Sequence, residues 1–228
     1  MTPEQILDHI AWHSLIGPQR AVSVGSEHAR RYAPGFSPII AFADLERPDF
    51  AALEPHCAAG EHFYCGGWSG AAPPGWHVEA ETQLVKMLWQ GTLPAADAHF
   101  APVKLGPEHI AQVLELVALT KPGPFGPRTL ELGDYFGCFE GERLVAMAGE
   151  RMHAGSLREV SGVCTDPAFQ GRGLARRLME TLLRRELERG EIPFLHVMQS
   201  NAGAHGLYQR MGFLDHRVET VRVLSRSG

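Results

Sequence analysis

A strand that runs through a glycine-containing turn into a long helix constrains the fold of this chain more than any other feature. Residues 157–165 have strand character, and residues 171–189 carry leucines at helical spacing along one stripe. Gly171 and Gly173 stand at the start of this helix, where backbone N–H groups lack partners and the helix dipole is positive. Because glycine has no Cβ, a ligand can approach this backbone closely. The segment is therefore predicted to hold a pyrophosphate.

Two common nucleotide-binding loops do not match this segment. A Walker A loop needs Gly-Lys followed by Ser or Thr, which is absent. The dinucleotide fingerprint needs Gly or Ala where Arg176 stands, and too little chain follows the helix for a doubly wound domain. The turn thus disfavours both ATP and NAD.

Both helices and strands are predicted on either side of this segment. Thr2, Pro3 and Gln5 form a capping box for a helix that ends near residue 15. Further helices are expected at residues 49–57, 107–119 and 202–211, and strands at 20–24, 37–43, 103–105, 135–139, 143–152, 194–198 and 216–224. Residues 65–75 are expected to be loop, and residues 79–89 fit either a helix or a strand.

The length and one linker-like segment predict how the chain divides. Its 228 residues suit one large domain or two small ones. Residues 91–98 have linker composition, so we expect a first domain at 1–98 and a second at 99–228.

Charge and composition restrict the kinds of partner and the cellular compartment that we expect. The net charge is −5 and no basic run is present, so a nucleic-acid partner is not expected. The chain shows neither a signal peptide nor an apolar stretch near the roughly 18 residues of a membrane span. Four scattered cysteines favour a reducing, cytoplasmic compartment.

His9 and His13 have helical spacing, but Ile10 stands where a zinc protease needs Glu, so no metal is expected.

Two motifs in the second half resemble the GCN5-related N-acetyltransferases (GNAT). The glycine turn reads Gln170-x-x-Gly173-x-Ala175, which is similar to the family's cofactor signature. A second family element starts at Asn201 and passes through Tyr208 to Gly212-Phe213. The resemblance covers about residues 100–225, and both motifs occur in the expected order.

The resemblance implies a fold and a subgroup. We expect an α/β (α+β) protein with a mixed, twisted sheet flanked by helices and splayed open between the strands that end at Thr165 and start near Phe194. Residues 161–165 look most like predicted acetyltransferases related to glycine N-acyltransferase. Those carry an N-terminal half that resembles a degenerate copy of the same fold, which residues 1–98 would suit.

The family also implies which residues bind acetyl-CoA, the cosubstrate. Backbone groups of the strand would pair with the pantetheine arm, backbone amides of the turn would hold the pyrophosphate, and Asn201 would cap the next helix and face the cofactor. The residues expected to bind are Val163, Cys164, Thr165, Gln170, Gly171, Arg172, Gly173, Leu174, Ala175, Arg176, Asn201 and Tyr208. Arg172 and Arg176 are also candidates for the 3′-phosphate.

The expected reaction is transfer of an acetyl group to a primary amine of a small molecule by direct attack in a ternary complex. The resemblance implies that Tyr208 protonates the departing thiolate. For the general base, His196 and Glu150 rank close together and Glu159 slightly behind, because the family takes this group from several places.

Four points stay open at this level. The donor could be a longer acyl-CoA, the acceptor could be a protein amine, and the chain could be a CoA-binding module without turnover. The chain is expected to be a monomer or a homodimer.

Overall fold

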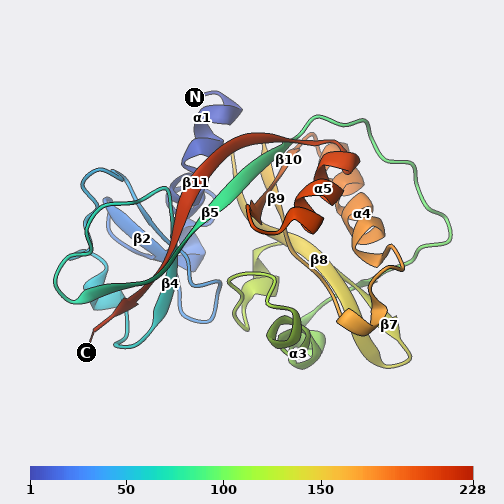
Figure 1. The fold of residues 1–228 in the computed structure, drawn as a ribbon, viewed down its shortest axis with the longest axis horizontal. Helices are drawn as coiled ribbons and strands as arrows, with labels where there is room; N and C mark the ends of the chain where they lie inside the picture. The colour runs from blue at the N-terminus through green and yellow to red at the C-terminus, as the bar shows by residue number, and fades with distance from the viewer. Residues whose placement is uncertain (228) are drawn as a thin grey trace.

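The computed structural model describes residues 1–227, and its main element is an eight-stranded sheet (Figure 1). The strand order is β4-β11-β5-β10-β9-β8-β7-β6. All neighbours are antiparallel except β9 and β10, which are parallel, so the sheet is mixed as predicted. The strands are β4 (His62–Gly66), β5 (Trp76–Trp89), β6 (Val103–Lys104), β7 (Tyr135–Glu140), β8 (Arg143–Ala154), β9 (Leu157–Thr165), β10 (Ile192–Met198) and β11 (Phe213–Arg226).

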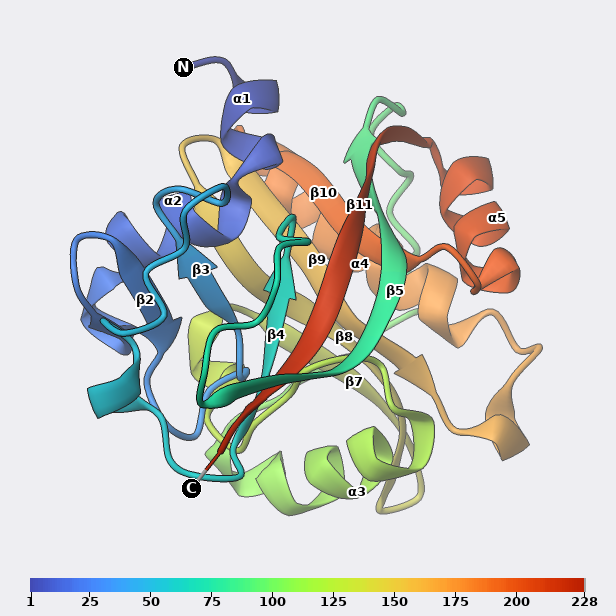
Figure 2. The same ribbon diagram turned by 60° about the vertical axis from the view of Figure 1, so that its left-hand side comes forward.

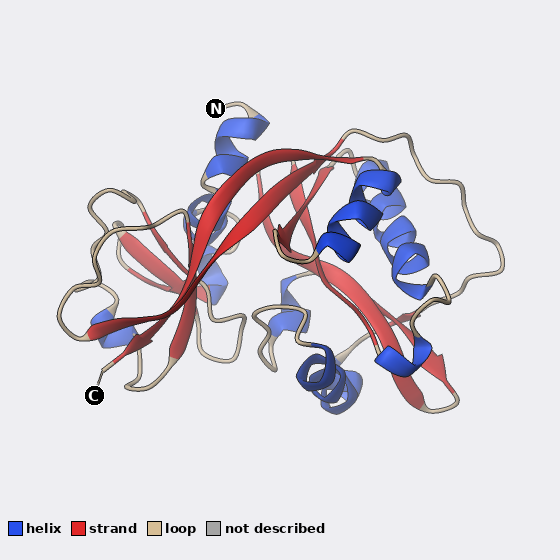
Figure 3. Ribbon diagram, viewed as in Figure 1, coloured by secondary structure: helices blue, strands red, loops and turns tan. Residues whose placement is uncertain are grey.

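Helices cover both faces of this sheet, as expected for the fold class (Figure 3). On one face α4 (Leu174–Glu188) buries its leucine stripe against β8, β9 and β10, and α5 (Ala202–Met211) packs beside it. On the other face lie α1 (Pro3–Asp8), α2 (Ile10–Ile16) and α3 (Ile110–Thr120). Within residues 1–227, no helix is long and apolar enough to cross a membrane.

The first 60 residues or so fold less regularly than the sequence predicts. The capping box at Thr2 is confirmed, but the expected single helix is two, because the backbone leaves helical geometry at His9 (φ −128°, ψ 39°). A second, three-stranded sheet follows, with strands β1 (Ser23–Gly25), β2 (Ala29–Tyr32) and β3 (Ile40–Phe42). The helix expected at 49–57 is wrong apart from one 3₁₀ turn, η2 (Glu54–His56), and η1 (Arg20–Val22) replaces most of the strand expected at 20–24.

One sheet contains strands from both sides of residue 98. β4 and β5 come from the first half, and β5 lies between β10 and β11 of the second half. Figures 1 and 2 show β5 and β11 as two long strands that run side by side from the neighbourhood of β4 to that of α5. The division into domains at residue 98 stays a prediction.

Candidate active site

The central sheet opens between β9 and β10. Register pairs between these parallel strands run only from Leu157–Ile192 to Glu159–Phe194. Over the described residues, 160–165 of β9 therefore have no strand partner on the β10 side. Such a row of unpaired backbone groups can bind an extended ligand as an added strand. This is the opening that the sequence predicts.

The turn after β9 has the geometry of an anion cradle. Gly171 and Gly173 adopt φ of +77° and +73°, in the left-handed region that glycine favours, and a Cβ on either would meet nothing within 4 Å. Gly173 is the N-cap of α4, and no side chain caps this helix end. The first amides of α4 are thus left for a ligand. Together with the unpaired edge of β9, these residues fit a pantetheine pyrophosphate.

Helix α5 places two predicted residues on the opposite wall. Asn201 Oδ1 accepts a hydrogen bond from the Ala204 backbone N–H at 3.1 Å, so the expected cap is present. Tyr208 lies nearly two turns further on and packs against Phe213, with ring centroids 6.2 Å apart. Burial raises the pKa of the Tyr208 phenol to about 12, so its hydroxyl is protonated at neutral pH and can donate.

These elements enclose one cavity of about 870 Å³, a size typical of ligand pockets. Of the residues predicted to bind the cofactor, all but one line it: Val163, Cys164, Thr165, Gln170, Gly171, Gly173, Leu174, Ala175, Arg176, Asn201 and Tyr208. The exception is Arg172, whose guanidinium stacks over Phe169, 4.7 Å from the ring centroid. Of the four predicted catalytic residues, Tyr208 and His196 line the cavity, whereas Glu150 and Glu159 do not.

Glu159 lies directly behind His196. Its Oε1 is 2.7 Å from His196 Nδ1, and both of its oxygens accept hydrogen bonds from the buried Arg151 guanidinium, at 2.7 and 3.0 Å. Burial alone would raise the pKa of Glu159, but Arg151 and His196 lower it to about 2, so the carboxylate is ionised. The arrangement holds the imidazole through Nδ1, and His196 itself lines the cavity.

Glu150 faces a different part of the molecule. Its Oε1 accepts a hydrogen bond from Arg189 at 2.6 Å, at the C-terminal end of α4, and its Oε2 accepts one from the Asp134 backbone N–H at 3.3 Å. The structure therefore does not bring Glu150 to the cavity. A one-residue change of register turns a strand side chain to the other face, and Glu150 lies between two irregularities of the β8–β9 pairing, so simple alternation along the strand does not give its face.

The far end of the cavity is lined by residues that the sequence did not single out. They come from the α1–α2 junction and from strands β4, β5 and β11: Asp8, His9, Tyr64, Lys86 and Glu219. Burial, with His13 and Lys86 nearby, lowers the pKa of His9, and its Nε2 has no hydrogen-bond partner. The one sequence signal for Lys86 is its place between Val85 and Met87, which becomes informative once residues 79–89 are known to be a strand.

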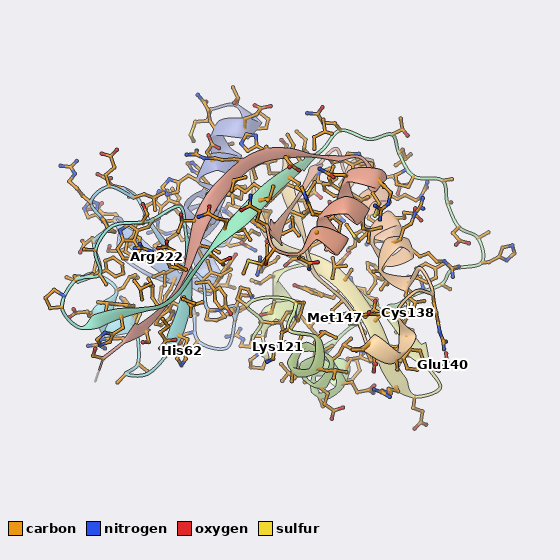
Figure 4. The ribbon with its side chains drawn as sticks, in the orientation of Figure 1. His62, Lys121, Cys138, Glu140, Met147 and Arg222 are labelled. Atoms are coloured by element: carbon orange, nitrogen blue, oxygen red, sulfur yellow. The ribbon has the colours of Figure 1, made fainter. Side chains whose placement is uncertain are left out.

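A proline-rich loop closes the cavity between its two ends. Figure 4 labels Lys121 at its start, directly after α3, and residues 120–124 line the wall. The Pro124 carbonyl accepts hydrogen bonds from Arg151 Nη1 at 3.3 Å and from Ser37 Oγ at 3.0 Å. The loop thus joins the Arg151–Glu159 pair to the N-terminal half.

Comparisons by family model and by solved structure both point to acetyltransferases. A family model described as "Acetyltransferase (GNAT) family" matches residues 114–213. A crystal structure from Novosphingobium aromaticivorans, assigned to the GNAT family of acetyltransferases, is 36% identical, covers 97% of this chain and 99% of that chain, and has a TM-score of 0.87. A GCN5-related N-acetyltransferase from Kribbella flavida, at 15% identity and a TM-score of 0.61, covers 100% of this chain and 97% of its own and is alike in fold alone.

Two curated bacterial proteins match shorter segments. N-alpha-acetyltransferase RimI of Mycobacterium tuberculosis is 44% identical over 55 residues, which is 24% of this chain and 34% of the relative. The [ribosomal protein bS18]-alanine N-acetyltransferase of Salmonella typhimurium is 36% identical over 85 residues, or 32% of this chain and 57% of the relative. The chain thus spans about a third of one curated relative and somewhat over half of the other.

Proposed function

The chain belongs to the acetyltransferase (GNAT) family, whose members use acetyl-CoA as cosubstrate, and we propose that it transfers the acetyl group to a primary amine of a small molecule. One observation carries this proposal. His196 and Tyr208 line the same cavity as the glycine turn, so a base, an acid and a cofactor cradle share one space. Holding the two reactants together in such a space removes much of the entropic barrier to their reaction.

In this proposal the two side chains move protons on opposite sides of the reacting carbon. His196 Nε2 takes a proton from the acceptor ammonium, and Glu159 stabilises the imidazolium that forms. Acetyl-CoA supplies the acetyl group as a thioester, so that the new C–N bond forms as the C–S bond breaks. The Tyr208 hydroxyl donates its proton to the departing thiolate, and the proton that the new amide nitrogen loses restores the phenol.

Direct attack by the amine agrees with the state of the cavity's thiol. Burial raises the pKa of Cys164 to about 11, so the side chain is a thiol rather than a thiolate at neutral pH. A thiol in this state is a poor nucleophile, and a covalent acyl-cysteine is not expected.

A small acceptor is favoured because N-terminal residues and the 121–124 loop line the end of the cavity beyond His196 and narrow the space for an acceptor there. The curated relatives favour a second candidate, the α-amine of a protein, since their names describe N-alpha-acetylation and acetylation of a ribosomal-protein alanine. Their matches are confined to segments of 55 and 85 residues, so most of this chain lies outside them.

We also keep the proposed subgroup, the acetyltransferases related to glycine N-acyltransferase, on the strength of residues 161–165. Membership of this subgroup leads to two further proposals. One is a division of labour between domains, in which residues 1–98 shape the acceptor site and residues 99–228 bind acetyl-CoA. Acetyl is the acyl group we expect, with longer acyl chains as the alternative.

The test has two steps. Thermal unfolding is followed with acetyl-CoA, longer acyl-CoAs and, as controls, NADH and ATP; a ligand at 100 times its Kd stabilises by about 2.7 kcal/mol. Release of the CoA thiol is then measured with small primary amines and with a peptide that begins with alanine.

We expect acetyl-CoA to stabilise most strongly and small amines to release thiol fastest. Faster release with the peptide would replace the small-molecule acceptor by a protein α-amine. Stabilisation by acetyl-CoA without release for any acceptor would indicate a binding module and refute the proposed enzyme.

A further inference from the structure

A row of ionisable side chains, most of which line the cavity, runs across five neighbouring strands, with one from each strand. Beyond Arg151 and Glu159, His196 of β10 stands directly opposite Lys86 of β5 in the strand register. Opposite residues of an antiparallel pair have Cβ atoms about 5 Å apart. Lys86 Nζ lies 2.9 Å from Glu219 Oε2 on β11. The row therefore leads from the proposed base to the far end of the cavity.

Lys86 offers no free hydrogen-bond donor to a ligand. Its side chain is 3% exposed, Nζ donates to the backbone carbonyls of Leu7 and Asp8, at 3.0 and 2.9 Å, and Nζ forms an ion pair with Glu219 Oε2 at 2.9 Å. An ammonium has three N–H donors, and three protein oxygens already surround this one. The break in the helix at His9 leaves carbonyls at the end of α1, and Lys86 satisfies two of them.

Only one of the two carboxylate oxygens of Glu219 forms an ion pair within the described part of the protein. Its side chain is 10% exposed and lines the cavity, and Oε2 holds Lys86, but among residues 1–227 no partner is present for Oε1. A Cβ on Gly66 would lie 2.8 Å from Oε1, so the absence of a side chain at Gly66, which also lines the cavity, leaves room for this oxygen. At the rim, Asp8 Oδ1 is bound by His216 and Arg217 at 2.9 and 3.3 Å. The cation of this pair is thus enclosed, whereas an acceptor oxygen faces the cavity.

The geometry points to a cation subsite at Glu219, so that the acceptor is a diamine whose second, protonated nitrogen binds there while the first reacts beside His196. This inference rests on the proposed transfer to a small-molecule amine and names its class. An ionised carboxylate with one oxygen free binds an ammonium more strongly than a neutral donor, and it repels a carboxylate.

The strand register sets the span of such an acceptor. Glu219 stands opposite Leu84, two residues along β5 from Lys86. Glu219 is therefore two strands away from His196, on the order of 10 Å. A linear chain of several methylenes between the two nitrogens matches this separation.

The experiment compares four ligands of equal chain length: 1,6-diaminohexane, 6-amino-1-hexanol, n-hexylamine and 6-aminohexanoate. Their Kd values are measured by calorimetry on the protein saturated with CoA, and kcat/KM is measured separately with acetyl-CoA. The variants are Glu219→Gln, the double variant Lys86→Met with Glu219→Gln, which leaves no unpaired buried ammonium, and Glu27→Gln as an exposed control.

We expect the diamine to bind at least about tenfold more tightly than hexylamine, the effect of one charged hydrogen bond. Both Glu219 variants should reduce this ratio to within about threefold, and Glu27→Gln should keep it. Equal binding of the amino alcohol and the diamine, or an unchanged ratio in the Glu219 variants, overturns the subsite.

The two proposals fail in different ways. Acetylation of amines without a preference for the diamine removes the subsite and leaves the transferase. A diamine preference in calorimetry without thiol release removes the proposed transfer and leaves the subsite.

Discussion

The buried carboxylate behind His196 allows a quantitative test of how the site is built. Glu159 is 1% exposed and accepts hydrogen bonds from Arg151, from the Met152 backbone N–H at 3.1 Å, and from His196. Glu159→Gln keeps the shape of the side chain and removes its charge. The variant then holds the Arg151 guanidinium, 9% exposed, with no counter-charge.

The size of the effect follows from the pKa of Glu159. Its decrease from 4.5 to about 2 corresponds to about 3 kcal/mol of stability at neutral pH. Loss of one partner from a buried ion pair costs about 3–5 kcal/mol, which agrees. Because the folded-state pKa is lowered, this stability is present above pH 4.5 and is lost as the pH falls towards 2.

Urea unfolding of the wild type and Glu159→Gln at several pH values measures this directly. The difference in unfolding free energy should be about 3 kcal/mol and constant from pH 8 to pH 5, and it should shrink below pH 4.5. Thiol release should fall by at least about tenfold, because the imidazole loses its orienting partner. A difference below 1 kcal/mol at pH 7, or one that does not change down to pH 3, would refute the reasoning.

Three further predictions test other parts of the structure. Tyr208→Phe should lower kcat by about tenfold to a hundredfold while the Kd of acetyl-CoA stays within about threefold. This is the low end for acid catalysis, because a phenol with a raised pKa donates its proton weakly. An unchanged kcat would refute the acid role of Tyr208. Gly173 and Gly190 lie at opposite ends of α4 with φ of +73° and +74°, so Gly173→Ala and Gly190→Ala should each lower the unfolding free energy by about 1 kcal/mol. Only Gly173→Ala should weaken acetyl-CoA binding, by at least about tenfold in calorimetry. Equal acetyl-CoA binding by the two variants would contradict a pyrophosphate site at the glycine turn. Glu186 is buried without a hydrogen-bond partner, and burial raises its pKa well above 4.5. The unfolding free energy of the wild type should therefore fall by up to about 1.4 kcal/mol per pH unit above pH 4.5, and Glu186→Gln should abolish this fall. Parallel curves of stability against pH for the two proteins would show that Glu186 is not the cause.

Local signals determined much of the second half of the chain. The predicted strand 157–165 and helix 202–211 coincide with β9 and α5, and the stripe of leucines predicted α4. Such elements are specified by nearby residues: a repeating apolar face, a cap such as Asn201, and glycines where φ is positive. The motif residues of the cofactor cradle are adjacent in the chain, so their position at the cavity was also predictable.

The secondary structure of the first half was harder to predict from local sequence patterns. Its strands β1, β2 and β3 have only three or four residues each, too few to show a period, and the residues expected to form a helix at 49–57 are held by packing around Phe50 and Trp68 instead. Residues 79–89 were ambiguous because residues 79–84 of the strand are exposed or half-buried on both faces and residues 85–87 are buried on both, so the sequence does not alternate cleanly.

The sequence by itself predicted the family, from two short motifs in the expected order, the glycine turn, and the placing of Asn201 and Tyr208 on one helix face, because each motif depends on residues that are close together in the chain. Only the tertiary structure decided which carboxylate supports His196, that Glu150 faces α4, and that Lys86 and Glu219 meet at the far end of the cavity. Those contacts join strands that are distant in the chain. Their register is set by packing and by irregular pairing across the whole sheet, which no local pattern encodes.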